Sequence, residues 1–137
     1  MGGCDEGTSE GDSAAGTVLV VDDDPAVTSL VREYLDQLSV VSTATETDPA
    51  AALERVDGLD LACVVSDYRM PGMDGIEFLT AVRDRNPDVP AVVFTSVDEE
   101  EVPERARERG ARVIEKSGSA ECFYDLVGAV EAVVEVG

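Results

Sequence analysis

Short apolar runs and amphipathic segments alternate along this chain from residue 17 onward. The apolar runs predict five strands, at residues 17–21, 39–43, 61–66, 91–95 and 112–115. After each run, apolar residues recur at the three- and four-residue spacing of one helix face. Because strands that alternate with helices are typical of a parallel sheet, the pattern predicts an α/β fold with helices on both faces.

The first and last predicted helices have the clearest apolar faces. Asp24 is expected to cap the first helix, with Pro25 at its first position. The predicted buried face of that helix consists of Val27, Leu30, Val31, Tyr34, Leu35 and Leu38. The helix from residue 119 has a similar face of Phe123, Leu126, Val127, Val130, Val133 and Val134. The pattern is weakest at residues 99–109, where only Val102 and Ala106 would face a core.

Reactive polar residues stand at the ends of four of these strands. Asp22 and Asp23 follow the first strand, Asp67 follows the third, Thr95 ends the fourth, and Lys116 follows the fifth. The carboxyl ends of parallel strands share one edge of the sheet, where open α/β folds bind ligands. Three acids, a hydroxyl and an ammonium at one edge indicate a site for a divalent cation and a phosphoryl group.

The same residues constrain the order of the strands. Asp22 and Asp23 can meet Asp67 only if the first and third strands are neighbours. A doubly wound sheet of the flavodoxin-like order 2-1-3-4-5 satisfies this condition, and its topological switch point falls between those two strands. Thr95 and Lys116 would then flank Asp67 from the fourth and fifth strands.

Composition limits the classes of protein to consider. With 137 residues and 44% hydrophobic residues, the chain is expected to form one globular domain, residues 17–137, after a flexible acidic tail at residues 1–16. No window approaches the roughly 18 apolar residues of a membrane span, and the start lacks a signal-peptide pattern. Cys4, Cys63 and Cys122 show no pair spacing, so we expect a reduced, cytoplasmic protein.

The charge balance is strongly acidic. Thirty acidic residues face ten basic ones, which gives a formal charge of −20 and disfavours binding to nucleic acid or to an anionic membrane. Lys116 is the only lysine. The chain is therefore either an ordinary acidic protein or, as the scarcity of lysine favours, a halophilic one whose repulsion is screened by molar salt.

The ordered motifs resemble the receiver domain of two-component response regulators, of the chemotaxis-regulator kind. Residues 18–23 are similar to the family's acidic pair at the end of its first strand, and residues 67–75 to its phosphoacceptor loop. Thr95, followed by the small Ser96, and then Lys116 complete the set. The resemblance extends over about residues 17–134.

This resemblance implies a role for each site residue. Asp67 would take a phosphoryl group from the phosphohistidine of a sensor kinase or a phosphotransfer protein, as an ionised carboxylate that needs no base. Mg²⁺ would be bound by Asp23, Asp67 and the backbone carbonyl of Arg69, with Asp22 acting through water. Thr95 and Lys116 would contact the phosphoryl oxygens.

The resemblance also implies an output by protein contacts. Inward movement of Thr95 would change the surface of the fourth helix, fifth strand and fifth helix for an unidentified protein target. A dimer that forms on phosphorylation is left open, as is whether the chain is a stand-alone regulator or part of a longer one. The implied chemistry is limited to self-phosphorylation and slow autodephosphorylation.

Two departures from the family pattern affect the switch. Ser117 and Gly118 follow the lysine where a proline is usual, and Val113 replaces a frequent aromatic residue. The span from residue 110 to Lys116 also looks one residue short. A switch by rotation of a ring at residue 113 is therefore excluded.

Three further alternatives follow from the sequence. A Mg²⁺-dependent phosphohydrolase would need a second acid two residues after Asp67, where Arg69 stands. A receiver that only binds partners would lack a site residue, and none is missing. The arginines at 105, 107, 109 and 112 form either a solvated face or a docking patch.

Overall fold

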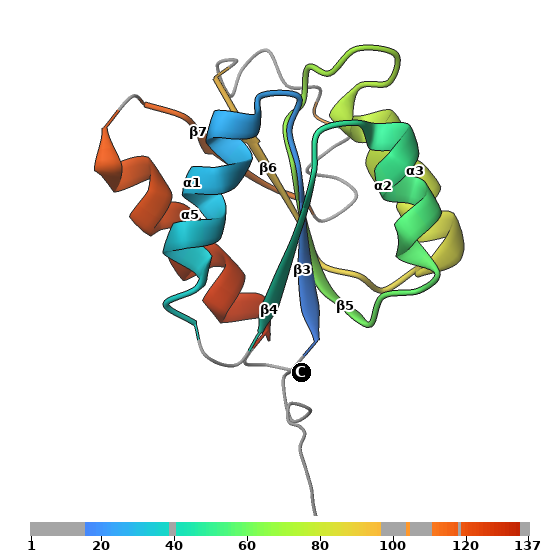
Figure 1. Ribbon diagram of the computed structural model, residues 1–137, viewed down its shortest axis with the longest axis horizontal. Coiled ribbons are helices and arrows are strands. Elements are labelled where there is room, and N and C mark those ends of the chain that lie inside the picture. Colours follow the sequence, from blue (N-terminus) through green and yellow to red (C-terminus); the bar gives the residue numbers. More distant parts are fainter. Residues whose placement is uncertain (1–15, 39–40, 97–103, 105–110, 118, 135–137) are drawn as a thin grey trace, which may run out of the picture.

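The computed structural model describes residues 16–38, 41–96, 104, 111–117 and 119–134. Its strands are β3 (Thr17–Val21), β4 (Ser42–Glu46), β5 (Leu61–Ser66), β6 (Ala91–Thr95) and β7 (Arg112–Glu115). Its helices are α1 (Pro25–Leu35), α2 (Pro49–Val56), α3 (Gly75–Arg85) and α5 (Ala120–Val134). Figure 1 shows these elements as a central twisted sheet between two pairs of helices.

The five strands form one parallel sheet in the order β4-β3-β5-β6-β7. This confirms the predicted order 2-1-3-4-5. β3 and β5 are neighbours, in register from Val18 opposite Cys63 to Val21 opposite Ser66. The residues that follow these two strands are therefore brought to the same edge of the sheet.

Two hydrophobic clusters hold the helices on opposite faces of the sheet. Helices α1 and α5 pack on one face, around the fully buried side chains of Val31, Leu35 and Leu126. Helices α2 and α3 pack on the other face, around Ala52 and Phe78. Alternate residues of β3, β5, β6 and β7 contribute to the two clusters, because successive side chains of a strand point to opposite faces.

Helix caps begin three of these helices directly beside the carboxyl edge of the sheet. Asp24 accepts a hydrogen bond from the N–H of Ala26 at 2.9 Å, and Pro25 occupies the first position of α1. Asp48 caps α2 in the same way. Asp74 and Glu77 form a reciprocal capping box at the start of α3. The predicted capping role of Asp24 is thus confirmed.

The structure corrects two details of the sequence prediction. The second strand lies at Ser42–Glu46 rather than at residues 39–43. This strand is at an edge of the sheet and is threonine-rich, so its apolar pattern is weak. In α1, Leu30 is 42% exposed, whereas Thr28 is buried. The Thr28 hydroxyl donates to the carbonyl of Pro25 at 3.0 Å, which satisfies the buried polar group.

Some predicted features fall outside the described residues, namely the helix at 99–109 apart from residue 104, the tail up to residue 15 and all of the arginine cluster except Arg112. Among the helices that the structure describes, none has both the length and the apolar character needed to cross a membrane.

Candidate functional site

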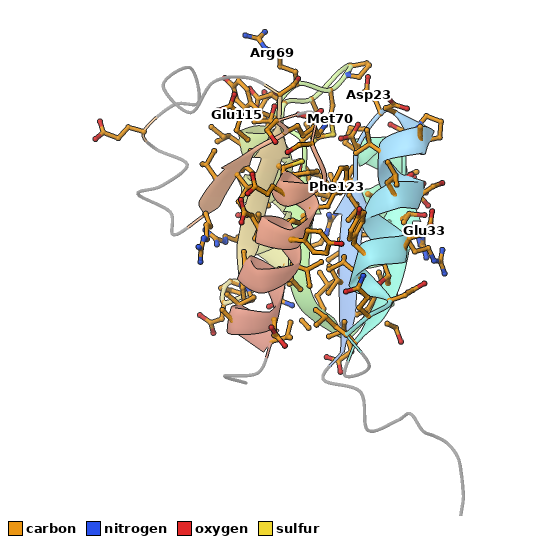
Figure 2. All side chains as sticks on the ribbon, turned by 90° about the vertical axis from the view of Figure 1, so that its left-hand side faces the viewer. Asp23, Glu33, Arg69, Met70, Glu115 and Phe123 are labelled. Carbon is orange, nitrogen blue, oxygen red and sulfur yellow. The ribbon has the colours of Figure 1, made fainter. Side chains whose placement is uncertain are left out.

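Three carboxylates meet at the carboxyl edge of the sheet. Asp22 and Asp23 follow β3, Asp67 follows β5, and one oxygen of each lies within 4.8 Å of the others. Asp22 and Asp67 are buried, with 3% and 9% of their surface exposed. Asp23 is exposed, and Figure 2 shows it at the upper end of the molecule, the end at which Arg69 and Met70 also lie. The acids predicted from separate motifs therefore form one cluster.

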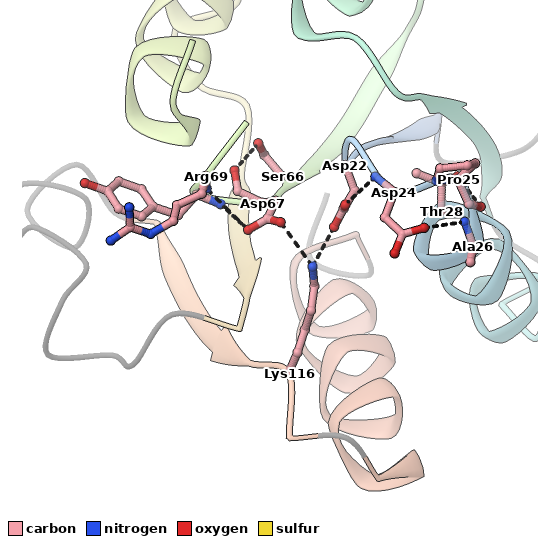
Figure 3. A network of polar contacts seen from close by, with 10 residues as sticks. Asp22, Asp24, Pro25, Ala26, Thr28, Ser66, Asp67, Arg69 and Lys116 are labelled. Atoms are coloured by element: carbon pink, nitrogen blue, oxygen red, sulfur yellow. Dashed lines mark hydrogen bonds and ion pairs between the residues drawn. The ribbon is translucent and has the colours of Figure 1, made fainter. Parts of the chain in front are cut away.

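Lys116 joins this cluster from the end of β7. Its ammonium donates to Asp22 Oδ2 at 2.6 Å and to Asp67 Oδ2 at 3.2 Å (Figure 3). Its backbone N–H donates to the carbonyl of Thr95 at 2.8 Å, which ties the lysine to the end of β6. Thr95 is itself buried. The structure thus brings Asp22, Asp67 and Lys116 into direct contact, and links Thr95 to them through the backbone.

The backbone after β5 fixes the orientation of Asp67. Its Oδ1 accepts hydrogen bonds from the N–H groups of Tyr68 at 2.6 Å and Arg69 at 3.4 Å (Figure 3). Its own N–H donates to the carbonyl of Val21 at 3.0 Å. The Arg69 side chain is exposed, and its guanidinium lies 5.8 Å from the centroid of the Tyr68 ring. Arg69 therefore contributes to the cluster through its backbone.

Glycine is required where the loop returns to α3. The N–H of Gly75 donates to the carbonyl of Tyr68 at 2.6 Å. A Cβ atom at this position would collide with the carbonyl oxygen of Asp67 and would lie 3.0 Å from Cα of Tyr68. Gly72 supplies the turn of the same loop, with a φ of 83° that L side chains rarely adopt. The two glycines allow α3 to begin directly against the Asp67 backbone.

Burial and charge act differently on the two partners of the closest ion pair. Burial raises the pKa of Asp22 above its ordinary value, although Lys116 and the N–H of Asp24 act in the opposite direction. For Lys116, burial lowers the pKa, but its hydrogen bond to Asp22 and the charges of Asp22 and Asp67 outweigh that effect and raise it. Lys116 therefore remains protonated at neutral pH.

The donor set fits a hard divalent cation. Three carboxylate groups offer oxygens within 4.8 Å of one another. Mg²⁺ prefers oxygen ligands and keeps several waters, and the exposed Asp23 leaves a side of the cluster open to them. Asp22, Asp23 and Asp67 are thus suited to hold such an ion.

One neighbour of the site was missed in the sequence. The ring of Phe94 lies 5.6 Å from Nζ of Lys116, measured to the ring centroid. Phe94 precedes Thr95 in β6, and sequence alone assigns it only to a buried strand. The contact depends on the face of the sheet toward which the lysine side chain extends, and no local sequence pattern predicts that face.

Comparison with known proteins identifies the family. The model of the response regulator receiver domain matches residues 18–127. The chain belongs to the response regulator receiver domain family. Domains of this family are phosphoacceptors in two-component systems. They bind Mg²⁺ at an acidic pocket and interact with histidine kinases or phosphotransfer proteins and with downstream effectors.

Among its relatives, this receiver is 38% identical over 80 residues to the transcriptional regulatory protein FixJ of Bradyrhizobium diazoefficiens, an alignment that covers 58% of this chain and 38% of FixJ. It is 34% identical over 112 residues to the C4-dicarboxylate transport transcriptional regulatory protein DctD of Pseudomonas aeruginosa, with coverage of 80% and 24%. The receiver thus spans less than half the length of these two relatives.

Solved structures agree with this assignment. The chemotaxis response regulator CheY4 of Vibrio cholerae is 26% identical, with a TM-score of 0.71 over 83% of this chain and 97% of that chain. The receiver domain of the Francisella response regulator 1452 shares the fold at 23% identity, with a TM-score of 0.75 over 88% and 97% of the two chains.

The two departures from the receiver pattern lie on either side of Lys116 in the sequence. Val113 is half-buried in β7 and packs against the cluster on the α2–α3 face. Ser117 follows the lysine, and its Oγ lies 3.1 Å from Oγ of Ser119, at the start of α5. The residue after the lysine is therefore in side-chain contact with the start of α5.

Proposed function

We propose that Asp67 is the phosphoacceptor of this receiver and that Asp22, Asp23, Thr95 and Lys116 assist its phosphorylation. The observation that carries the proposal is the ammonium of Lys116 between Asp22 and Asp67 at the carboxyl edge of the sheet. The family assignment supports it independently, because the match extends over all of these residues.

The transfer makes one bond and breaks one. An oxygen of the Asp67 carboxylate attacks phosphorus while the bond from phosphorus to the imidazole nitrogen of the donor breaks. That nitrogen keeps the electron pair and takes a proton from solvent. The hydrogen bonds from the N–H groups of Tyr68 and Arg69 hold the carboxylate in place before the attack, which limits the reorganisation needed in the transition state.

Charge is the main obstacle to this reaction. Three carboxylates already lie together, and the incoming phosphoryl group brings further negative charge. The ammonium of Lys116 offsets part of it, and the hydroxyl of Thr95 is proposed to donate to a phosphoryl oxygen. Bound Mg²⁺ would offset the remainder and orient the phosphoryl oxygens. Asp23, Asp67 and the carbonyl of Arg69 are proposed as its direct ligands, with Asp22 acting through water.

The proposed partners are a sensor histidine kinase or phosphotransfer protein, which donates the phosphoryl group, and a protein target, which receives the signal.

A cytoplasmic setting is in keeping with Cys63 and Cys122 as buried free thiols. Burial raises the pKa of Cys63 to about 12, so this residue remains a protonated core thiol. The proposed activity is confined to self-phosphorylation and slow autodephosphorylation.

Phosphorylation by acetyl phosphate, followed by intact-mass measurement, tests the assignment. The protein should gain one phosphate in the presence of Mg²⁺ and none with a chelator, and Asp67→Asn should gain none. Asp48→Asn is the matched control, because Asp48 also follows a strand but caps α2, a role that asparagine fills equally well. An undiminished mass gain in Asp67→Asn would overturn the proposal.

A further inference from the structure

The ring of Phe94 lies beside the ammonium of Lys116, under cover of α1 and α5. Nζ is 5.6 Å from the ring centroid, within the roughly 6 Å range of a cation–π contact. Phe94 is 1% exposed and the Lys116 side chain is 17% exposed. Because both groups are largely removed from water, the attraction is weakly screened and belongs to the stronger end of such contacts.

Other aromatic residues fix the position of this ring. Phe123 of α5 meets Phe94 edge-on, at 5.5 Å between ring centroids and 65° between planes. Phe123 is in turn stacked on Tyr34 of α1, at 5.0 Å and 13°. Figure 2 shows Phe123 between α5 and α1. The Phe94 ring is therefore held by two helices that pack on the sheet, and not by the strand alone.

The backbone of Lys116 does not by itself fix the position of its ammonium. The residue follows β7, an edge strand, and its backbone N–H bonds to the carbonyl of Thr95. The ammonium stands at the end of a flexible four-carbon stem. Its charged partners, Asp22 and Asp67, use the same carboxylates that are proposed to serve the metal. A cation bound there competes with Lys116 for them, whereas the neutral ring has no oxygen to offer a metal.

We infer that Phe94 is a positioning residue for Lys116, which keeps the ammonium over the site when the carboxylates are engaged by Mg²⁺. The inference rests on the proposed function, because it takes Asp22 and Asp67 as metal-binding groups. In the metal-free protein Asp22 and Asp67 hold the ammonium in addition to the ring, whereas in the metal-bound protein the ring is the contact that remains. Loss of the ring should therefore raise the free energy of the metal-bound state more than that of the metal-free state and weaken Mg²⁺ binding, and only while Lys116 is present.

A double-mutant cycle on Mg²⁺ affinity, measured by calorimetry without a phosphodonor, tests this dependence. Phe94→Leu should lower the affinity by about 3- to 30-fold, the range expected for a cation–π contact of this burial. In the Lys116→Met background, the same change should alter the affinity by less than about twofold, since the contact is already absent. Equal losses in the two backgrounds, or no loss in either, would overturn the inference.

Fluorinated phenylalanines separate the charge of the ring from its packing, and carry the test if Phe94→Leu does not fold. Added fluorines weaken the attraction of the ring for a cation with little change of shape. The Mg²⁺ affinity should fall stepwise as fluorines are added at residue 94. Phe78 is the matched control, because it is fully buried on the other face of the sheet. A flat series at residue 94, or equal slopes at both positions, would contradict the inference.

The outcome is distinguishable from that of the proposed function. A mass gain of one phosphate in Asp67→Asn would overturn the assignment of Asp67 as the phosphoacceptor. The cycle contains no phosphodonor, so its result concerns Mg²⁺ binding and the contact between Lys116 and Phe94, and not which residue is phosphorylated.

Discussion

Asp22 is buried beside two other carboxylates, and its environment raises its pKa. The folded protein therefore binds the proton of the Asp22 carboxyl group more tightly than the unfolded chain does. Stability is lost as the pH rises through the folded pKa of Asp22, because above it a buried charge must be maintained. The raised pKa of Lys116 acts in the same direction but at higher pH, since its contribution is fully present at neutral pH and is lost only when the lysine deprotonates. Lys116 and a bound cation thus both offset the cost of assembling the acids.

Adjacent acids in the triplet after β3 have different contacts, and this separates their roles. Asp23 belongs to the three-carboxylate cluster, whereas Asp24 accepts a hydrogen bond from the N–H of Ala26 as the cap of α1. We expect Asp23→Ala to lower Mg²⁺ affinity by more than the roughly 10- to 100-fold that outer-shell partners contribute. Asp24→Ala should instead cost about 0.5–2 kcal/mol of stability. Calorimetric titration and thermal melting of both variants measure the two effects, and equal losses of Mg²⁺ affinity would mean that the metal site is misplaced.

At the scale of elements, the inner strands β3, β5 and β6 could be predicted because they are buried on both faces and so read as apolar runs. The strand order followed from the acids that must meet at one edge. β4 lies three residues beyond its predicted start because an edge strand rich in threonine has no such run. Leu30 of α1 was wrongly expected in the core because spacing does not reveal how far the helix face extends.

The site itself was predictable only in part. Acids at strand ends can be read locally, so the meeting of Asp22, Asp23 and Asp67 was expected. Phe94 lies in β6 and Lys116 follows the neighbouring strand β7, so their contact is made between residues of two different strands. Such a contact depends on tertiary packing and leaves no periodic signal.

The junction of the Asp67 loop with α3 provides a test at this scale. In Gly75→Ala, the new Cβ would collide with the carbonyl of Asp67, so the loop must shift. We expect a loss of about 1–3 kcal/mol in stability, with slower phosphorylation because the Asp67 carboxylate moves with its backbone. Gly128→Ala in α5 is the control, since its Cβ would meet nothing within 4 Å. Alanine there should stabilise the protein by about 0.5–1 kcal/mol. Denaturant unfolding and phosphorylation rates measure both, and a Gly75→Ala protein of unchanged stability and rate would show that the loop has room to adjust.

At the scale of the whole molecule, the formal charge of −20 opposes folding. Compaction brings thirty acids together, and only ten basic residues offset them. At about 0.1 M salt, charges interact over roughly 10 Å, and at about 1 M over roughly 3 Å. The acidic cluster at the site concentrates the same repulsion locally, so salt and metal binding should both stabilise this receiver.

The last prediction therefore concerns melting across salt concentration. We expect the melting temperature to fall steeply below roughly molar salt, because the repulsion is no longer screened. Millimolar Mg²⁺, compared with a monovalent salt at equal ionic strength, should recover part of the loss by binding the folded form. At a Mg²⁺ concentration of about 100 times the dissociation constant, binding stabilises the folded form by about 2.7 kcal/mol.

Asp67→Asn separates screening from metal binding in that series. Removal of one charge from the cluster should stabilise the metal-free protein at low salt and abolish the specific effect of Mg²⁺. The general dependence on monovalent salt should remain, because it arises from the rest of the surface. A flat melting temperature from low to molar salt would remove the expectation of a halophilic protein and leave the family assignment intact. Persistence of the Mg²⁺ effect in Asp67→Asn would instead place the bound cation away from the three carboxylates.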